Sequence, residues 1–585
     1  MRNRVAFALA LTLAVAGYTG LEAAAKKKNA EEAKQFLKQV PDDQKILQAL
    51  NRLTFGPRPG DVQDVKAMGL KKWIDRQLHP ESIEENPVLI EKLKYLDTLP
   101  MSSAELVRNY PTPQIAKQMI AGRLPFPTDP ERRILLTKMV EKYEKKQAAG
   151  ADPNAAPNPN VPDIKALTEV LSPDEIRSLR QGTPQDRVAA FKTMPKEKQD
   201  AVIAALPGGQ RQALLMASPP EIRRRLEMAA GPQQLVARDL IEGKILRAVY
   251  SDRQLEAVLT DFWYNHFNVY LDKGADRYLV TEYERDVIRP HVLGKFKDLL
   301  EATAKSPAML FYLDNWQSVG PDAPMAGRGQ KKGARGLNEN YGRELMELHT
   351  LGVDGGYSQK DVTEVARCFT GWTILNPQRG GTFQFNPRMH DNGEKTVLGV
   401  TIPAGGGIAD AEKVLDIVAH HPSTARFISK KLAMRFVADN PPDALVDRMA
   451  ETFRKSNGDL RAVMKTMLDS KEFFSEGAYR SKMKSPLELV ASAVRAVNGD
   501  INFAFPLANQ VAQLGQPLYR KQEPTGYSNS SMEWMNSGGL VGRMNFALQL
   551  ADNKVPGVKV DSAKVARPDD PMAGIALGSP EFQKR

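Results

Sequence analysis

Residues 338–352, NENYGRELMELHTLG, show the spacing of polar and apolar side chains that recurs through most of this sequence. On a helix with 100° per residue, Asn340, Glu344 and Glu347 fall within about 60° of one another. Asn338 stands where an N-cap residue would accept the first free amides. The segment therefore predicts a helix that carries a polar cluster on one face.

The same helical spacing extends over nearly every long segment, including residues 232–550, which we predict to be the main helical domain. The exception is a pair of alternating runs, TFQFN (382–386) and KTVLG (395–399), separated by a turn-forming Asp-Asn-Gly sequence. Such runs predict a β-hairpin. The expected fold class is mainly α: a multi-helical globular protein with one small β-hairpin near 382–399 and an inserted array of short helices.

The inserted array follows a stretch rich in proline and asparagine, ADPNAAPNPNVP (151–162), which predicts a linker. Across residues 163–231 a proline recurs every 11 or 12 residues: Pro173, Pro184, Pro195, Pro207 and Pro219. A proline at the first helical position is favourable, so each is expected to begin a short helix. The inward faces are predicted to be Leu167, Leu171, Leu179, Phe191, Val202, Leu206 and Leu214. Residues 26–150 form an amino-terminal helical region, and 551–585 a C-terminal tail.

The first 25 residues have the pattern of an export signal. Arg2 and Arg4 precede an apolar run from 5 to 17, and three alanines at 23–25 provide a cleavage site before Lys26. The apolar run is shorter than the roughly 20 residues that cross a bilayer. We therefore expect an exported protein, periplasmic or extracellular, with no transmembrane span in the mature chain.

Charge and cysteine content narrow the function further. The net charge of +11 is spread over 585 residues, with acids and bases interspersed, so we expect no nucleic-acid partner. The one cysteine, Cys368, excludes a disulfide framework, and its place in a predicted helix (358–370) favours a buried apolar role. No HExxH, Gly-x-Ser-x-Gly or phosphate-loop motif is present.

A second polar cluster stands in FWYNHFNVY, residues 262–270. The aromatic side chains indicate burial, so Tyr264, Asn265 and His266 need hydrogen-bond partners. His349 in the first segment lies about 140° from Glu344 and is expected to serve a different purpose from the glutamates.

The segment RMHDNGEKTVLG (388–399) adds His390 and Asp391. If the three segments meet, they supply a mixed nitrogen and oxygen ligand set that suits a divalent metal such as zinc, manganese or iron: His266, Glu344, Glu347, His390 and Asp391. The alternative is that the glutamates form ion pairs with nearby arginines (Arg343, Arg367 or Arg285) and only hold the helices in register.

These motifs together resemble the bacterial Domain of Unknown Function 1800 family. The resemblance covers residues 42–96 and 235–585 and rests on LNRLTFGPRPGDV (50–62), FWYNHF (262–267), the long segment 337–372, HDNGEKTVLG (390–399), HPSTARFISKKLAMRFV (421–437), KSPLELV (484–490), LGQPLY (514–519) and the terminal SPEF. It implies a large, mostly helical, exported bacterial protein whose activity is not established. Family members are often encoded beside an exported protein similar to sulfatases and alkaline phosphatases, which makes such a protein the expected partner.

Two positions depart from the family pattern. Tyr264 stands where the family usually has a histidine, and Gly526-Tyr527 stands where it usually has Gly-Trp. The first departure removes one ligand from a His-x-His metal site.

We therefore carry two functional hypotheses. The first is an exported accessory or binding protein that acts with a partner. The second is a metal-assisted enzyme, hydrolase-like, in which Glu344 or Glu347 is the base or a ligand. In the second, Asn340 and Asn265 would orient groups, and the ligands would be His266 and His390 with Asp391.

Overall fold

The computed structural model describes residues 34–149, 167–205, 214, 216, 218–326, 336–535, 537–560 and 576–585. The predicted export signal (1–25) and the predicted linker (151–162) lie outside these residues, as do Pro207 and Leu206 of the array.

Helices make up most of the described chain, which confirms the mainly α fold class. The amino-terminal part contains α2 (Asp42–Leu53), α3 (Asp61–Met68), α4 (Leu70–Leu78), η1 (Pro80–Ser82), α5 (Pro87–Leu93), α6 (Ser103–Asn109), α7 (Pro113–Ile120) and α8 (Pro130–Ala149). The inserted part contains α10 (Pro173–Gln181), α11 (Pro184–Thr193), α12 (Lys196–Ala205) and α14 (Pro220–Ala230).

The main helical part follows from residue 232. Its first half contains α15 (Pro232–Tyr250), α16 (Gln254–His266), α17 (Asp276–Glu282), η2 (Tyr283–Ile288), η3 (Arg289–His291), α18 (Phe296–Lys305), α19 (Pro307–Tyr312), η4 (Asn315–Gln317), α20 (Asn340–Glu344), η5 (Leu345–Thr350) and α21 (Gln359–Cys368). Its second half contains η6 (Pro377–Arg379), α22 (Ile408–Ala419), α23 (Pro422–Phe436), α24 (Asp443–Lys455), α25 (Leu460–Leu468), α26 (Pro486–Ala496), α27 (Phe505–Gln513), η7 (Ser531–Trp534), α28 (Ser537–Ala551) and α31 (Pro580–Gln583).

The predicted hairpin between residues 382–386 and 395–399 is wrong. Within the described residues there are three two-stranded antiparallel sheets. They pair β1 (Trp372–Leu375) with β2 (Thr382–Phe385), β3 (Lys395–Val397) with β4 (Val400–Ile402), and β5 (Asp500–Ile501) with β6 (Val558–Lys559). Leu398 and Gly399 join β3 to β4 with φ of 49° and 77°, and positive φ at both central residues is what a tight hairpin turn requires. Each predicted strand therefore pairs with a strand nearer to it in sequence.

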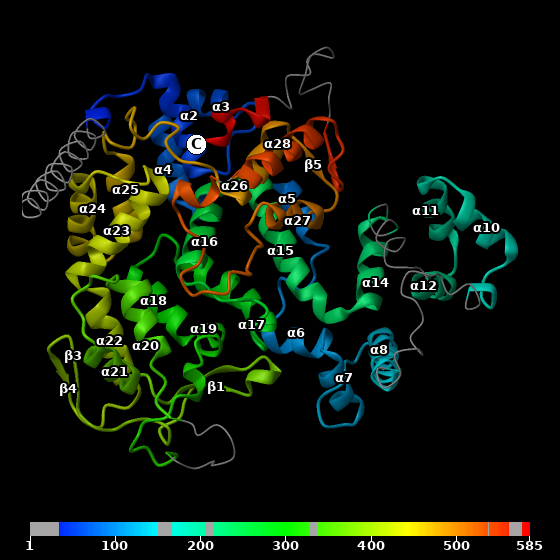
Figure 1. Ribbon diagram of the computed structural model, residues 1–585, viewed down its shortest axis with the longest axis horizontal. Coiled ribbons are helices and arrows are strands. Elements are labelled where there is room, and N and C mark those ends of the chain that lie inside the picture. The colour runs from blue at the N-terminus through cyan, green and yellow to red at the C-terminus, as the bar shows by residue number, and fades with distance from the viewer. Residues whose placement is uncertain are drawn as a thin grey trace, which may run out of the picture.

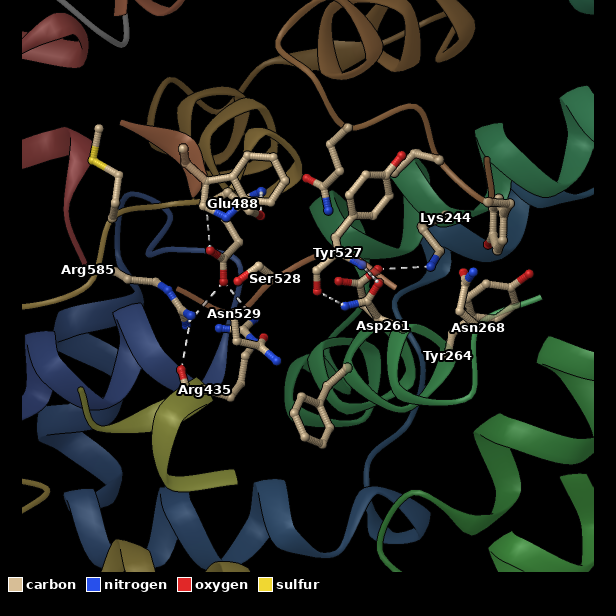
Figure 2. Close-up of a pocket in the computed structure, with 18 residues that line it drawn as sticks. Lys244, Asp261, Tyr264, Asn268, Arg435, Glu488, Tyr527, Ser528, Asn529 and Arg585 are labelled. Carbon is tan, nitrogen blue, oxygen red and sulfur yellow. Dashed lines mark hydrogen bonds and ion pairs between the residues drawn. The ribbon is translucent and has the colours of Figure 1, made fainter. Parts of the chain in front are cut away.

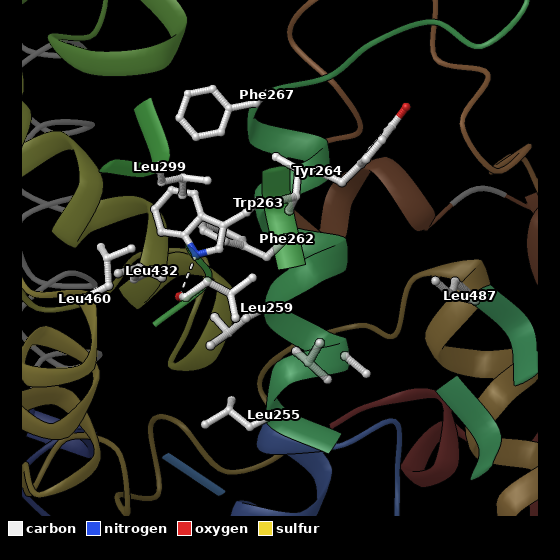
Figure 3. Packing of buried hydrophobic residues seen from close by; sticks show 14 of the residues in the cluster. Leu255, Leu259, Phe262, Trp263, Tyr264, Phe267, Leu299, Leu432, Leu460 and Leu487 are labelled. Atoms are coloured by element: carbon white, nitrogen blue, oxygen red, sulfur yellow. Dashed lines mark hydrogen bonds between the residues drawn. The ribbon is translucent and has the colours of Figure 1, made fainter. Parts of the chain in front are cut away.

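The main core is built around α16, which runs through the middle of the molecule (Figures 1 and 3). Trp263 is fully buried there, and its indole Nε1 donates a hydrogen bond to the Val292 carbonyl at 3.2 Å. Its ring packs edge-on against Phe262 and lies 6.0 Å from Phe296. This packing fixes the position of the polar residues that follow on the same helix, Asn265 and His266.

The proline-spaced array has a small core of its own. Helices α10, α11 and α12 lie to one side of the main body (Figure 1). Ser172 and Thr183 cap α10 and α11, each with a proline at the first helical position, as predicted. Six of the seven residues predicted to face inward lie in this separate core and are at least partly buried: Leu167, Leu171, Leu179, Phe191, Val202 and Leu214. Helix α14 begins one residue later than expected, at Pro220.

Residues 576–585 were predicted as part of a C-terminal tail, but they return to the main body. Lys584 forms an isolated antiparallel bridge with Met483, and the Arg585 side chain is only 4% exposed. Among the described helices, none combines the length and the apolar content that crossing a membrane requires.

Candidate functional site

The central segment forms a helix with a change of pitch. Helix α20 continues directly into η5, which is a π-helix. The wider turn is stabilised by a hydrogen bond from the Thr350 hydroxyl to the Leu345 carbonyl at 2.6 Å. Asn338 accepts the Asn340 amide at 2.9 Å, although the helix itself begins at Asn340. Short π-helical segments occur frequently at functional sites, so this segment is a candidate functional site.

Glu344 and Glu347 lie close together, as predicted, and both are half-buried. Burial raises the pKa of Glu344, and the neighbouring Glu347 carboxylate raises it further. Burial raises the pKa of Tyr357, and the neighbouring Glu347 carboxylate raises it further. Asn340, in contrast, is exposed and does not share this environment.

The glutamates do not form the ion pairs that the structural alternative required. In the described part of the chain, neither Glu344 nor Glu347 has an arginine or lysine nitrogen within 4.0 Å. The three arginines have other partners: Arg343 pairs with Glu339, Arg367 with Glu364 and Asp391, and Arg285 with Asp286. The two carboxyl groups therefore lie side by side without a close counter-ion among the described residues, and the pKa of Glu344 is raised.

His266 and His349 form a buried histidine pair on the side of η5 that faces α16. Nε2 of His266 lies 3.0 Å from the His349 carbonyl oxygen, and the two rings are 6.1 Å apart. Nδ1 of His266 and Nε2 of His349 have no hydrogen-bond partner among the described residues. Burial, together with the positive charge of Lys431, lowers the pKa of both imidazoles, and that of His349 falls to about 3.

This lowered pKa predicts an acid-sensitive fold. In the unfolded chain His349 takes up a proton near the ordinary histidine pKa of 6.5, whereas the folded protein binds that proton only near pH 3. Stability from this group is therefore present above pH 6.5 and is lost as the pH falls toward 3. Between pH 6.5 and 4.5, we expect the free energy of unfolding of His349→Phe to fall less steeply than that of the wild type, by about 1 kcal/mol per pH unit. Denaturant unfolding at several pH values measures both slopes. The same dependence of the unfolding free energy on pH in the two proteins would contradict the prediction.

His390 and Asp391 belong to a different network and are themselves buried. His390 Nδ1 lies 2.8 Å from the Thr370 carbonyl, and its Nε2 lies 3.2 Å from a carboxylate oxygen of Asp410. Lys395 donates to the same Asp410 oxygen at 2.6 Å. Asp391 forms an ion pair with Arg367 at 2.8 Å. Each of these polar groups is paired within the network.

The predicted metal site is therefore not formed as one ligand set. In the residues that the structure describes, no group of three or more histidine, cysteine, aspartate or glutamate side chains is arranged to hold a metal ion. His266 contacts His349, whereas His390 contacts Asp410, because the two histidines belong to separate buried networks. His266 is buried and partnered, as expected, and His390 is buried as well, but the sequence did not indicate which partners they would have.

Asn265 and Tyr264 hold neighbouring backbone in place. Asn265 accepts the Tyr527 amide at 2.6 Å and donates back to the Tyr527 carbonyl. Gly526 adopts φ +67°, and a Cβ there would lie 2.1 Å from the Asn265 carbonyl oxygen, so only glycine fits this approach. Tyr264 donates to the Val269 carbonyl at 2.8 Å. Tyr264 and Tyr527, the two residues that depart from the family pattern, thus each have structural contacts of their own.

A polar cleft opens beside Asn265, between α16, α23, α26 and residues 516–534 (Figure 2). Its volume is about 50 Å³, which is enough for a few water molecules or one small polar group. The charged side chains that line it are Lys244, Asp261, Arg435, Glu488 and Arg585.

The charged groups of the polar cleft are arranged at two ends. At one end Lys244 pairs with Asp261 at 2.9 Å. At the other end Glu488 accepts from Arg435 at 2.6 Å and lies 3.1 Å from Arg585. Burial alone would raise the pKa of Glu488, but the two guanidinium groups lower it to about 2.

No sequence pattern indicated this cleft. Its members come from segments separated by up to several hundred residues, and no local pattern joins them. One local signal was available: Ser485 and Glu488 form a capping box at the start of α26, with the Ser485 amide donating to Glu488 at 2.9 Å.

The chain is thus a large, mainly helical protein with a charged cleft. The chain belongs to the family described as Protein of unknown function (DUF1800), which matches residues 48–580. No curated protein and no solved structure matches the chain. The family resemblance inferred from the motifs is confirmed.

Proposed function

We propose that this protein is an exported binding protein that holds a small polar ligand in the polar cleft and acts as an accessory to a partner outside the cytoplasm. The observation that carries the proposal is the convergence of buried charged side chains from α15, α23, α26 and the segment ending at Arg585 on one cleft. Small-ligand sites commonly place a few polar groups inside a rigid, mostly apolar scaffold.

Ligand content tests this function. The chain would be purified from its native envelope or culture medium, and the small molecules released on denaturation would be analysed by mass spectrometry. Ser528 lines the mouth of the cleft and is exposed, so Ser528→Phe should block entry without removing a charged group. We expect one compound at near-stoichiometric amount in the wild type and at least tenfold less in the variant. Equal content in both proteins, or none in the wild type, would reject the proposal.

The export part of the proposal rests on the sequence of residues 1–25. Amino-terminal sequencing of the exported form should begin at or close to Lys26. Recovery of the chain only from the cytoplasm, with Met1 retained, would reject export.

The partner part rests on the family resemblance, which implies an exported protein similar to sulfatases and alkaline phosphatases. The array of α10, α11 and α12 has its own small core and therefore offers a separate surface for this partner protein. Affinity purification from the native envelope at low salt tests the pairing, and consistent recovery of the chain alone would count against it.

A second candidate is an enzyme in which Glu344 acts as a general acid or base. The observation that favours it is the raised pKa of this half-buried carboxyl group next to a π-helix. Groups with perturbed pKa values concentrate at active sites. The metal-assisted form of this hypothesis is tested at the glutamates. After loading with zinc, manganese or iron, Glu344→Ala should retain less metal than the wild type.

Raised proton affinity at Glu344 gives a stability prediction. The folded protein binds this proton more tightly than the unfolded chain, whose pKa is near 4.5. Stability from the group is therefore present below pH 4.5 and is lost as the pH rises through the higher folded pKa. Glu344→Gln should stabilise the protein at pH 8, by less than about 1 kcal/mol because solvent screens a half-buried group, and should have no effect at pH 4. Thermal unfolding at both pH values measures the difference, and destabilisation at pH 8 would contradict the assignment.

A further inference from the structure

A cluster of buried positive charge surrounds one end of the polar cleft. The cation cluster, as we call it, consists of Arg52, Arg435, Lys482, Lys484, Arg543 and Arg585, all of them buried. Within the described residues its ion pairs reach only two carboxylates, Asp439 and Glu488. Positive charge thus exceeds negative charge in a region that water reaches poorly, which is costly for the fold.

The shortage of negative charge is visible at individual side chains. Glu488 is shared by two guanidinium groups, and Lys482 pairs with Asp439. Lys484 has no ion pair among the described residues, and its ammonium lies 3.7 Å from the centre of the Phe582 ring. Burial lowers the pKa of Lys484 to about 7, with the positive charge of Arg585 contributing. Burial and Arg585 likewise lower the pKa of Lys482 to about 8.

Two members of the cation cluster line the cleft and retain unused donors. Nη1 of Arg435 and Nε of Arg585 are buried and have no hydrogen-bond partner in the described part of the chain. The oxygens of Glu488 are engaged by Arg435, Arg585 and the Ser485 amide, so this carboxylate does not satisfy those donors. Ser528 and Asn529 line the same end of the cleft and add neutral polar groups (Figure 2).

We propose that the polar cleft binds a small free oxyanion of the phosphate or sulfate type, held by Arg435 and Arg585. This inference rests on the proposed binding function and names its ligand class. Each guanidinium has an unused N–H group that can donate to an oxyanion, and such charge-assisted hydrogen bonds are roughly twice as strong as neutral ones. The cleft volume of about 50 Å³ suits a group of this size and excludes a large organic ligand.

The probe for the test is inorganic phosphate. Isothermal titration calorimetry of the purified full chain would compare phosphate with chloride at matched ionic strength, and sulfate would be used in competition. Arg435→Gln removes the donor, and Ser528→Phe fills the mouth of the cleft while leaving the cation cluster intact. Lys430→Gln, an exposed position on the same helix α23, removes the same charge at the surface and is the matched control. Vesicles of phosphatidylglycerol distinguish a lipid headgroup from a free anion.

We expect saturable phosphate binding that sulfate displaces. Arg435→Gln and Ser528→Phe should each weaken it at least about tenfold, as expected for the loss of a charge-assisted hydrogen bond or of access, whereas Lys430→Gln should stay within about twofold. Should Arg435→Gln fail to fold, Ser528→Phe decides the question. The proposal is overturned if phosphate gives no saturable signal beyond chloride, if binding survives in Ser528→Phe, or if the chain binds only vesicles.

The failure of this inference can be separated from the failure of the proposed function. If mass spectrometry finds a bound compound without a phosphate or sulfate group, and phosphate does not bind, the anion assignment fails while the binding function stands. If Ser528→Phe weakens the binding of neither phosphate nor any native compound, both the anion assignment and the proposed binding function fail.

Discussion

Replacing Glu488 with glutamine is expected to lower the free energy of unfolding by about 3–5 kcal/mol at pH 7. The carboxylate is 6% exposed and lies between Arg435 and Arg585, which are similarly buried. Removing its charge leaves two guanidinium groups without their shared counter-ion, in a place where water cannot solvate them. Glutamine keeps the size of the side chain, so the loss measures charge rather than packing.

The effect of Glu488→Gln should depend on pH in a defined direction. The folded pKa of Glu488 is lowered to about 2, whereas the unfolded value is near 4.5. The stability that its charge contributes is therefore fully present above pH 4.5 and is lost as the pH falls toward 2. The difference between wild type and variant should be largest near pH 7 and should shrink below pH 4. Urea unfolding across this range measures it.

Glu451→Gln is the matched control. Glu451 pairs with Lys455 at 2.6 Å, but both side chains are more than half exposed, so their interaction is screened by solvent. We expect little change in stability for this variant. A loss of similar size in both variants would show that the buried cluster has no special dependence on Glu488.

Local patterns predicted the parts of this fold that are determined locally. The helical spacing of apolar residues indicated the mainly α class, and Ser-Pro and Thr-Pro pairs located the caps of α10 and α11. Cys368 is buried at the end of α21, as its place in a predicted helix indicated. The adjacency of Glu344 and Glu347 was predicted because residues three apart are neighbours on an α-helix. The two carboxyl groups still influence each other although the helix continues as a π-helix from Leu345.

Pairings between distant segments could not be predicted in the same way. The two strand runs at 382–386 and 395–399 are each compatible with several partners, and residues 386–394 are instead held by the contacts of His390 with Thr370 and of Asp391 with Arg367. The metal hypothesis required the segments of His266 and His390 to meet, but burial alone does not select a partner. A buried imidazole pairs with a backbone carbonyl as readily as with another side chain or a metal.

The cation cluster shows the same limit more strongly. Arg52 donates to the carbonyls of Val437 and Ala478, more than 380 residues away in sequence. In the sequence each of its members reads as an ordinary charged residue. Only the folded chain reveals that several of them share one buried region, which is why the candidate ligand class follows from the structure and not from the motifs.

Trp263→Ala is expected to lower the free energy of unfolding by about 3–5 kcal/mol, through loss of packing in the main core. The indole is fully buried on α16 among Phe262, Phe267 and Phe296, and its removal also leaves the Val292 carbonyl without its donor (Figure 3). Trp263→Phe should cost less, because most of the ring volume is retained. Denaturant unfolding measures both variants.

The Trp263 variants also test how the core supports the candidate site. His266 lies edge-on to the indole, with ring centres 5.3 Å apart, so a cavity at residue 263 would let the imidazole move away from His349. Water entering that cavity would solvate the charged imidazole, so the pKa of His266, which burial holds well below its usual value, should rise. NMR titration of the histidines in Trp263→Phe and in the wild type would detect the shift. Leu548→Ala, at a half-exposed position on α28, is the control, and equal losses of stability at residues 263 and 548 would contradict the central role of α16.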